Sequence, residues 1–205
     1  MTKKIHERIS SVNRKTSETQ IKVNVNLDGT GKYSIITGLP FFDHMIQQLS
    51  KHSLVDIDIK CDGDLEIDSH HTIEDVGWAL GKAVNEALGN KQGIKRYSFS
   101  YLPMDECLTR CCIDISGRPW LVWNVFLPNV TIKDIETEIF REFFQSFSQS
   151  AEITLHIENI YGQNTHHIIE SCFKSMAISL RNAIKFDLRN LDRVPSTKGT
   201  LTGNK

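Results

Sequence analysis

Residues 39–59 read LPFFDHMIQQLSKHSLVDIDI, and residues 137–157 read TEIFREFFQSFSQSAEITLHI. The two stretches align without a gap, so that Phe42 falls on Phe140 and Leu49 falls on Phe147. Apolar residues three or four positions apart share one face of a helix, whereas the alternation that ends each stretch is typical of a strand. The sequence therefore predicts an amphipathic helix followed by a strand, and it predicts this unit twice.

A second pair of segments extends the duplication toward the start of each copy. Residues 18–29 align with residues 106–117, with Glu18 on Glu106 and Gly29 on Gly117. Both segments alternate apolar and polar residues and end in a turn. Because self-similarity of this kind indicates a repeated structural unit, each copy is expected to place strands before its first helix.

A five-residue motif completes both copies. It reads His70-His71-Thr72-Ile73-Glu74 in the first copy and His166-His167-Ile168-Ile169-Glu170 in the second. Each motif opens a stretch with apolar residues at helical spacing. We therefore expect each copy to run strand, strand, helix, strand, a further short strand and helix.

These elements predict an α/β (α+β) fold made of two similar halves. We expect residues 1–92 to form the first half and residues 93–190 to form the second, joined around Gly93. Each half should hold a mostly four-stranded sheet with two helices on one face, and the helices should lie sandwiched between the two sheets because only that packing buries them. Residues 191–205, rich in Ser, Thr, Gly and Lys, are expected to form a mobile tail.

The composition excludes several classes of function. The 205 residues hold 24 Lys and Arg against 25 Asp and Glu, so no global basic charge is available to attract nucleic acid or an anionic membrane. The chain has no apolar run of roughly 20 residues and does not open with a signal peptide. Five cysteines without zinc-ligand spacing fit a reducing compartment. We interpret the protein as cytoplasmic.

The repeated motif indicates a metal site. At the start of a helix, residues three or four apart share a face while neighbours diverge, so one histidine can join the glutamate on one metal ion while the adjacent histidine points to another. Imidazole and carboxylate together suit first-row divalent metals from manganese to zinc. The alignment adds His44 and Glu142, which occupy matching positions on the first helix of each copy. His6, His52 and His156 are weaker candidates.

Six separated motifs, in order along nearly the whole chain, resemble the imidazoleglycerol-phosphate dehydratase family. They include GLPFFDHM at residues 38–45, DSHHTIED at 68–75, PMDE at 103–106, DISGRP at 114–119, NTHHIIE at 164–170 and VPSTKG at 194–199. The resemblance implies dehydration of D-erythro-imidazole glycerol phosphate to imidazole acetol phosphate in histidine biosynthesis, assisted by two manganese ions in each active site. It also implies a hollow homo-oligomer of about 24 subunits whose neighbours complete each active site.

The resemblance assigns site residues position by position. The implied metal ligands are His44, His70, His71, Glu74, Glu142, His166, His167 and Glu170. Many relatives place histidine where this chain has Glu142, a departure that bears on geometry or metal preference. The implied phosphate and substrate contacts are Arg96, Arg118, Lys174, Ser196, Lys198, Gln48 and Asp105, so the tail is expected to contribute to the phosphate site.

Catalysis needs a group that moves protons, because the substrate has no carbonyl to acidify its C–H bond. The family places Glu18 at the substrate, which makes Glu18 the leading candidate, with His71 and His167 as catalytic metal ligands. Glu106 and Asp105 are alternatives for the proton transfer. Two other functions stay open at this point: a dimetal His/Glu hydrolase or oxygenase, and a non-catalytic metal-binding shell protein.

Overall fold

The first half of the chain forms a four-stranded sheet with two helices on one face. The computed structural model describes residues 7–133 and 135–201. The strand order is β1-β2-β4-β3, in which β3 runs parallel to β4 and the other pairs are antiparallel. The elements are β1 (Ile9–Lys15), β2 (Thr19–Asn26), β3 (Tyr33–Ile36), α1 (Pro40–Ser53), β4 (Asp56–Gly63) and α2 (His70–Leu88).

The second half repeats this arrangement. Its strand order is β5-β6-β10-β7, and β7 again runs parallel to its neighbour. The elements are β5 (Tyr97–Met104), β6 (Cys107–Asp114), β7 (Trp120–Asn124), α3 (Phe140–Ser150), β10 (Thr154–Tyr161) and α4 (Thr165–Ala183). A small hairpin of β8 (Thr131–Ile132) and β9 (Ile135–Glu136) and a short 3-10 helix, η1 (Thr137–Ile139), lie before α3.

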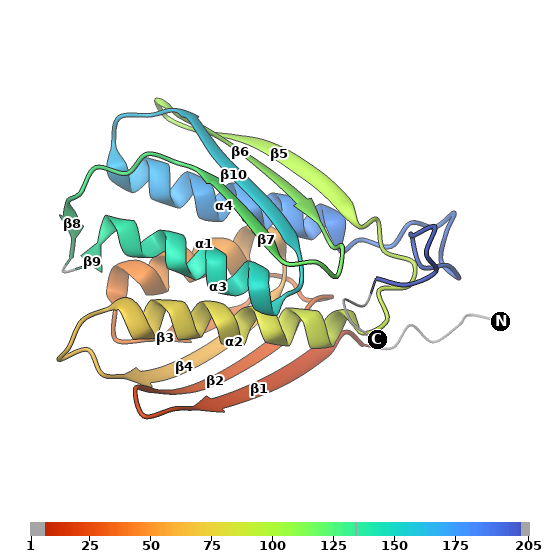
Figure 1. Cartoon of the computed structure of the whole chain (residues 1–205), viewed down its shortest axis with the longest axis horizontal. Coiled ribbons are helices and arrows are strands. Elements are labelled where there is room, and N and C mark those ends of the chain that lie inside the picture. The colour runs from red at the N-terminus through yellow and green to blue at the C-terminus, as the bar shows by residue number, and fades with distance from the viewer. Residues whose placement is uncertain (1–6, 134, 202–205) are drawn as a thin grey trace.

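The two sheets form the outer layers and the four helices fill the space between them (Figure 1). Helix α2 packs on α3, and α1 packs on α4, so that each helix pair joins the two halves. The close approach of α2 and α3 depends on glycine, because a Cβ atom at Gly77 would lie 2.7 Å from the carbonyl oxygen of Phe143. The predicted α/β fold with sandwiched helices is confirmed.

Aromatic side chains fill the centre of the helix layer. Phe143 is fully buried and its ring lies 5.0 Å from that of Phe173 and 5.6 Å from that of Phe42, measured between centroids. The three rings come from α3, α4 and α1. A single continuous core therefore serves both halves, as two layers of sheet on one layer of helices require.

One detail of the expected element order is wrong. Among the described residues, no strand lies between β4 and α2 or between β10 and α4; the additional strands, β3 and β7, precede the first helix of each half. The physical reason is local. Asp68 accepts a hydrogen bond from the backbone of His70, and Asn164 accepts one from the backbone of His166, so the chain turns directly into each helix.

The tail makes defined contacts as far as the structure follows it. The backbone N–H of Gly93 donates to the carbonyl of Arg193 at 2.9 Å, and Leu201 is buried. The expected mobility of the tail stays a prediction, as does the boundary between residues 92 and 93. His6 and residues 202–205 lie outside the described residues.

No helix in the described part of the chain is long and apolar enough to pass through a bilayer. The location of the protein in the cytoplasm stays a prediction.

Candidate metal centre

Three side chains of the predicted ligand set meet where α1 packs on α4. His166 Nε2 lies 3.0 Å from Glu170 Oε2, and His44 Nε2 lies 3.7 Å from the same oxygen. Each of the three residues offers one ligand atom, and these atoms all lie within 4.8 Å of one another. Two imidazole nitrogens and one carboxylate oxygen at this spacing fit a divalent first-row metal ion.

Glu170 is the buried member of this cluster, with its side chain 6% exposed. Burial alone would raise the pKa of Glu170, but the hydrogen bond and charge of Lys174, together with His166 and His44, hold the pKa below its usual value. The ammonium nitrogen of Lys174 lies 2.6 Å from Glu170 Oε1. The structure therefore places Lys174, predicted to bind phosphate, beside the metal cluster.

The equivalent position in the first half is more open. His70 Nε2 lies 3.5 Å from Glu74 Oε2, and both side chains are nearly half exposed. Glu142, on α3, forms an ion pair with the neighbouring Arg141 at 2.9 Å. Helices α2 and α3 are packed together, but a cluster of three or more potential ligands is found, among the described residues, only at His44, His166 and Glu170.

The second histidine of each motif, His71 or His167, contacts carboxylates that lie outside the motif. His71 Nδ1 lies 3.0 Å from Asp64 Oδ2, and His167 Nδ1 lies 2.7 Å from Glu106 Oε2. This arrangement is typical of metal-binding histidines, in which one ring nitrogen donates to a carboxylate and the other faces the metal. Asp64 was missed by the sequence analysis.

Each of these histidines has a second carboxylate near its other nitrogen. His71 Nε2 lies 3.8 Å from Glu18 Oε1, and His167 Nε2 lies 3.7 Å from Asp105 Oδ2. Asp105 therefore makes the contact with Nε2 in the second half that Glu18 makes in the first half. The alignment of the two copies had paired Glu18 with Glu106 instead.

Several hydrogen-bond donors surround the carboxylate of Glu106 and lower its pKa. The backbone N–H of Asn164, the His167 ring and the backbone N–H of Gln163 all donate to its carboxylate and lower the pKa of Glu106 to about 2. A group with so low a pKa is a weak base near neutral pH. Glu106 in turn raises the pKa of His167, as Asp64 raises the pKa of His71.

The remaining predicted phosphate contacts gather at the opposite end of α4. Arg96 is buried, its Nε lies 2.7 Å from Asp114 Oδ1, and its Nη1 donates to the carbonyl of Pro195 at 2.7 Å. Arg118 is 63% exposed and lies 3.9 Å from Asp114. The Oγ of Ser196 accepts the backbone N–H of Lys198. These residues therefore share one neighbourhood around Asp114 and the tail.

Within one chain this neighbourhood is distant from the metal cluster. The backbone of Arg96 donates to Ala183, the last residue of α4. Glu170 precedes Ala183 by about 13 residues, which corresponds to about 20 Å along a helix. The single chain brings three of the candidate metal ligands together and brings the phosphate candidates together, but it does not join the two groups.

Gln48 and Asp105 are the two other predicted substrate contacts. Gln48 Nε2 is 3.5 Å from His44 Nε2, and Gln48 Oε1 is 3.1 Å from His52 Nε2, so Gln48 links the metal cluster to the end of α1. Asp105 is 79% exposed and in the left-handed region, with a φ of 48°.

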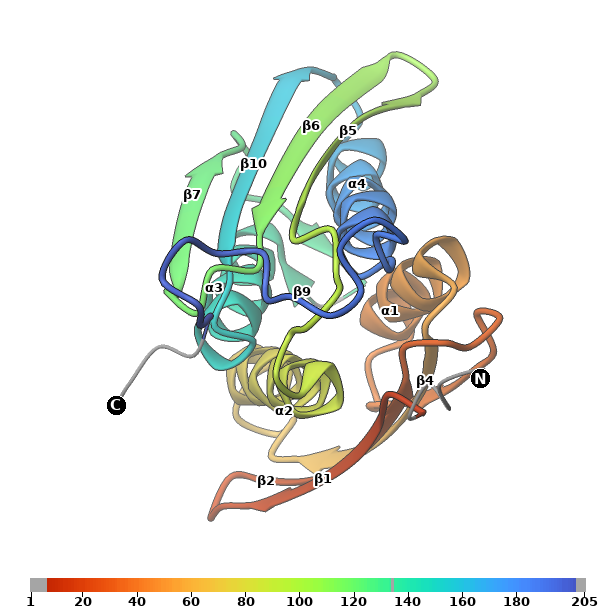
Figure 2. The ribbon, with the colours of Figure 1, turned by 90° about the vertical axis from the view of Figure 1, so that its right-hand side faces the viewer.

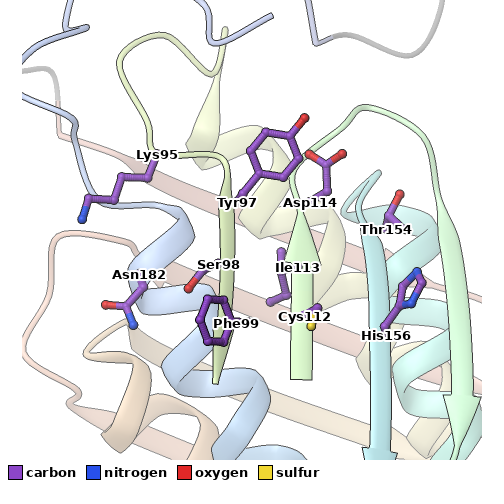
Figure 3. A pocket seen from close by; sticks show the side chains of 10 residues that line it. All are labelled: Lys95, Tyr97, Ser98, Phe99, Cys112, Ile113, Asp114, Thr154, His156 and Asn182. Carbon is purple, nitrogen blue, oxygen red and sulfur yellow. The ribbon is translucent and has the colours of Figure 1, made fainter. Parts of the chain in front are cut away.

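A cavity of about 530 Å³ on the outer face of the second sheet lies outside the metal centre. Figure 3 places Phe99, Cys112 and His156 along its wall, with Asp114 at one end. Asn182, near the end of α4, also lines it. The cavity therefore lies at the end of the helix that is remote from Glu170.

Fold and site together define a class of protein: a duplicated α/β protein with a His/Glu centre suited to a divalent metal. A family model described as imidazoleglycerol-phosphate dehydratase matches residues 37–180. The chain is 55% identical to the imidazoleglycerol-phosphate dehydratase of Sinorhizobium fredii, covering 95% of this chain and 96% of that protein. It is 54% identical to that of Ruegeria pomeroyi, over 95% and 100%.

Solved structures agree. The Staphylococcus aureus imidazoleglycerol-phosphate dehydratase superposes with a TM-score of 0.79 at 35% identity, covering 87% of this chain and 99% of that one. The Pyrococcus furiosus protein, in complex with (S)-C348, gives 0.80 at 32% identity, over 93% and 100%. The chain belongs to the imidazoleglycerol-phosphate dehydratase family, which confirms the resemblance. It is a hydro-lyase of histidine biosynthesis, so neither a dimetal oxygenase or hydrolase nor a non-catalytic shell protein describes it.

The Glu106–His167 pair predicts a specific pH dependence in the metal-free protein. Glu106 raises the pKa of His167 above the ordinary 6.5. Protonated His167 therefore adds to the free energy of unfolding fully below pH 6.5, and this contribution is lost as the pH rises through the raised pKa. The contribution of Glu106 is present above its ordinary 4.5 and is lost as the pH falls toward 2.

The substitution Glu106→Gln should lower the pKa of His167, because an amide keeps the backbone hydrogen bonds but removes the charge. The rate at which an acylating reagent modifies neutral His167, followed across pH by peptide mass spectrometry, measures that pKa. Glu136→Gln, an exposed change on β9, serves as the control and should leave the profile unchanged. An identical profile for Glu106→Gln would contradict the assigned cause.

Proposed function

We propose that manganese binds at the cluster of His44, His166 and Glu170 and that dehydration of imidazole glycerol phosphate takes place there. The observation that carries this proposal is the set of three ligand atoms within 4.8 Å of one another. The family is metal-dependent, and the donor set of two nitrogens and one oxygen fits manganese as well as its neighbours in the first row. A bound divalent ion supplies Lewis acidity to the imidazole ring of the substrate.

A second manganese site belongs to His70, Glu74 and Glu142 in this proposal. Its support is the duplication, because α2 and α3 pack as α4 and α1 do. Glu142 would leave Arg141 to bind metal, a rotation that a partly exposed helix side chain permits. In both proposed sites, the longer helix, α4 or α2, provides a histidine and a glutamate. The shorter helix, α1 or α3, provides one further ligand.

Neighbouring subunits would complete both sites. Asp64 and Glu106 hold the Nδ1 atoms of His71 and His167, and the Nε2 atoms lie near Glu18 and Asp105, which are not candidate metal ligands. A histidine so oriented suits a metal held by another subunit. The hollow shell of about 24 subunits that the family resemblance implies fits this arrangement.

The distance along α4 supports the same conclusion for the phosphate. The five bonds from imidazole ring to phosphorus, at about 1.5 Å each, give the substrate a reach of roughly 6–7 Å. That is far less than the ~20 Å of helix between Glu170 and Ala183. Arg96, Arg118, Ser196 and Lys198 would therefore bind the phosphate of a substrate whose ring lies at a metal cluster of a different subunit. Lys174, beside Glu170, would instead contact the substrate near the metal.

Glu18 would move the proton. It is close to His71 Nε2 and its side chain is about half exposed, so an incoming substrate can reach it. Glu106 is set aside by its low pKa, and Asp105 occupies the corresponding place near His167. The carboxylate of Glu18 would accept the proton of the substrate C–H bond, and the electron pair of that bond would form a C=C bond to the adjacent carbon. The hydroxyl group on that carbon would leave with the electron pair of its C–O bond, take up a proton from solvent and depart as water. The resulting enol would tautomerise to the ketone of imidazole acetol phosphate.

Metal removal tests the first part of the proposal. Chelator-treated protein should lose dehydration of imidazole glycerol phosphate, and added Mn²⁺ should restore it with a matching manganese content by elemental analysis. His166→Ala should lower that content because it removes one ligand of the cluster. Full metal content in His166→Ala, or full turnover by the stripped protein, would refute the site.

Substitution of Glu18 tests the proton transfer. Glu18→Gln should lower kcat by about 10²- to 10⁴-fold, the usual contribution of a general base, while metal content stays unchanged. Turnover and elemental analysis of the same sample measure both. Glu66→Gln, an exposed change on the loop after β4, is the matched control and should retain the wild-type kcat. An unchanged kcat in Glu18→Gln would remove Glu18 from the mechanism.

Subunit mixing tests whether active sites lie between chains. His71→Ala and His166→Ala should each be nearly inactive. The two variants are stripped of metal, mixed in equal amounts and reloaded with Mn²⁺. Roughly a quarter of the sites should then combine an intact His71 from one subunit with an intact His166 from another, so the mixture should recover up to roughly a quarter of the wild-type rate. Each variant processed alone is the control. If His71 and His166 serve one site from the same chain, the mixture stays inactive.

A further inference from the structure

A buried lysine lies at the junction of the two halves, outside the metal centre. Lys91 follows the end of α2, and its side chain is only 1% exposed. Its backbone has a φ of 60°, in the left-handed region that non-glycine residues seldom adopt. Burying a charged ammonium group is costly unless partners compensate it. Lys91 therefore needs a structural reason for its position.

The partners of Lys91 come from two distant parts of the chain. The ammonium nitrogen donates to the carbonyl of Leu201 at 3.2 Å and lies 3.6 Å from Glu152 Oε2, just after α3. Burial lowers the pKa of Lys91, and the charge and hydrogen bond of Glu152 oppose that effect. Leu201 is itself buried at 4% exposure. Lys91 thus fastens the tail to the junction between the halves.

The fastened segment is the one that carries the phosphate candidates. Arg96 Nη1 donates to the carbonyl of Pro195, and Lys91 donates to that of Leu201, so cationic side chains from one linker hold both ends of residues 195–201. Between them Ser196 and Lys198 form a turn, in which the Ser196 carbonyl accepts the backbone N–H of Gly199. Figure 2 shows the tail, in dark blue, passing from α4 toward α3.

We propose that Lys91 is a positioning residue that anchors the tail at Leu201 and thereby presents Ser196 and Lys198 to the phosphate of the substrate. This inference rests on the proposed phosphate role of the tail. An anchored turn loses less conformational entropy on binding than a free end does, so the anchor strengthens phosphate binding without touching the substrate. The two partners of Lys91, Leu201 and Glu152, are not candidate metal ligands, so we expect the metal centre to be unaffected by its loss.

The test is Lys91→Met, which keeps the length of the side chain and removes its donor. The KM for imidazole glycerol phosphate should rise about tenfold, the order expected for one lost charge-assisted hydrogen bond, with kcat changed less than about twofold. Inhibition by inorganic phosphate should weaken by a similar factor, whereas inhibition by imidazole, which reaches only the metals, should stay the same. Lys95→Met, an exposed change on the same linker, should alter none of these values.

A double-mutant cycle separates anchoring from general stability. In a Ser196→Ala/Lys198→Met background, Lys91→Met should change KM less than about twofold, because the groups that it positions are gone. A full tenfold effect there, or equal weakening of phosphate and imidazole, would overturn the proposal. Should Lys91→Met fail to fold, truncation after Thr200 removes the Leu201 acceptor and must produce the same selective loss of phosphate inhibition.

The same set of variants distinguishes the two proposals. If Ser196→Ala/Lys198→Met alone leaves KM unchanged, the phosphate role of the tail is wrong. If that variant raises KM while Lys91→Met does not, the phosphate role holds and the anchor is wrong.

Discussion

The metal cluster depends on the burial of helices between two sheets. In each half of the chain, two helices cover one face of a sheet. The apolar side of those helices that points away from the sheet cannot be buried within one half. The halves solve this by pairing α1 with α4 and α2 with α3. Because of that cross-pairing, His44 from the first half meets His166 and Glu170 from the second. The same packing that stabilises the fold therefore assembles the ligands.

The two halves have diverged in the polar groups around their histidines while keeping the geometry. Asp64 does for His71 what Glu106 does for His167, although the two carboxylates come from different connecting segments. Asp64 follows β4, whereas Glu106 precedes β6. Equivalent chemistry has thus been built from non-equivalent positions, and the constraint that both halves satisfy is a carboxylate at Nδ1 of the second histidine.

This divergence sets the limit of what the sequence could predict. The gapless alignment predicted both sheets and the sandwiched helices, and it added His44 to the candidate ligands, because core residues recur at helical or strand spacing. It did not predict that His44 would meet the second motif, which depends on the packing of α1 on α4. It could not find Asp64, since the aligned residue in the second copy is Gly162, and the loops that lead into α2 and α4 differ in length. It paired Glu18 with Glu106, and both residues directly precede the second strand of their half, yet they contact different histidine nitrogens. It did not indicate that Asp105 would take the place beside His167 Nε2. Loops carry no periodic pattern, so contacts across them appear only in three dimensions.

The two carboxylate oxygens of Glu170 face different partners. Its Oε1 accepts Lys174, and its Oε2 faces His44 and His166. A metal ion at the cluster can therefore bind Oε2 while Lys174 keeps its place, so the lysine orients the carboxylate instead of competing for the metal. An ammonium group has three donors, and the pairing with Glu170 uses one of them. The other two donors would allow Lys174 to contact an anionic ligand as well, in agreement with the substrate contact proposed for it above.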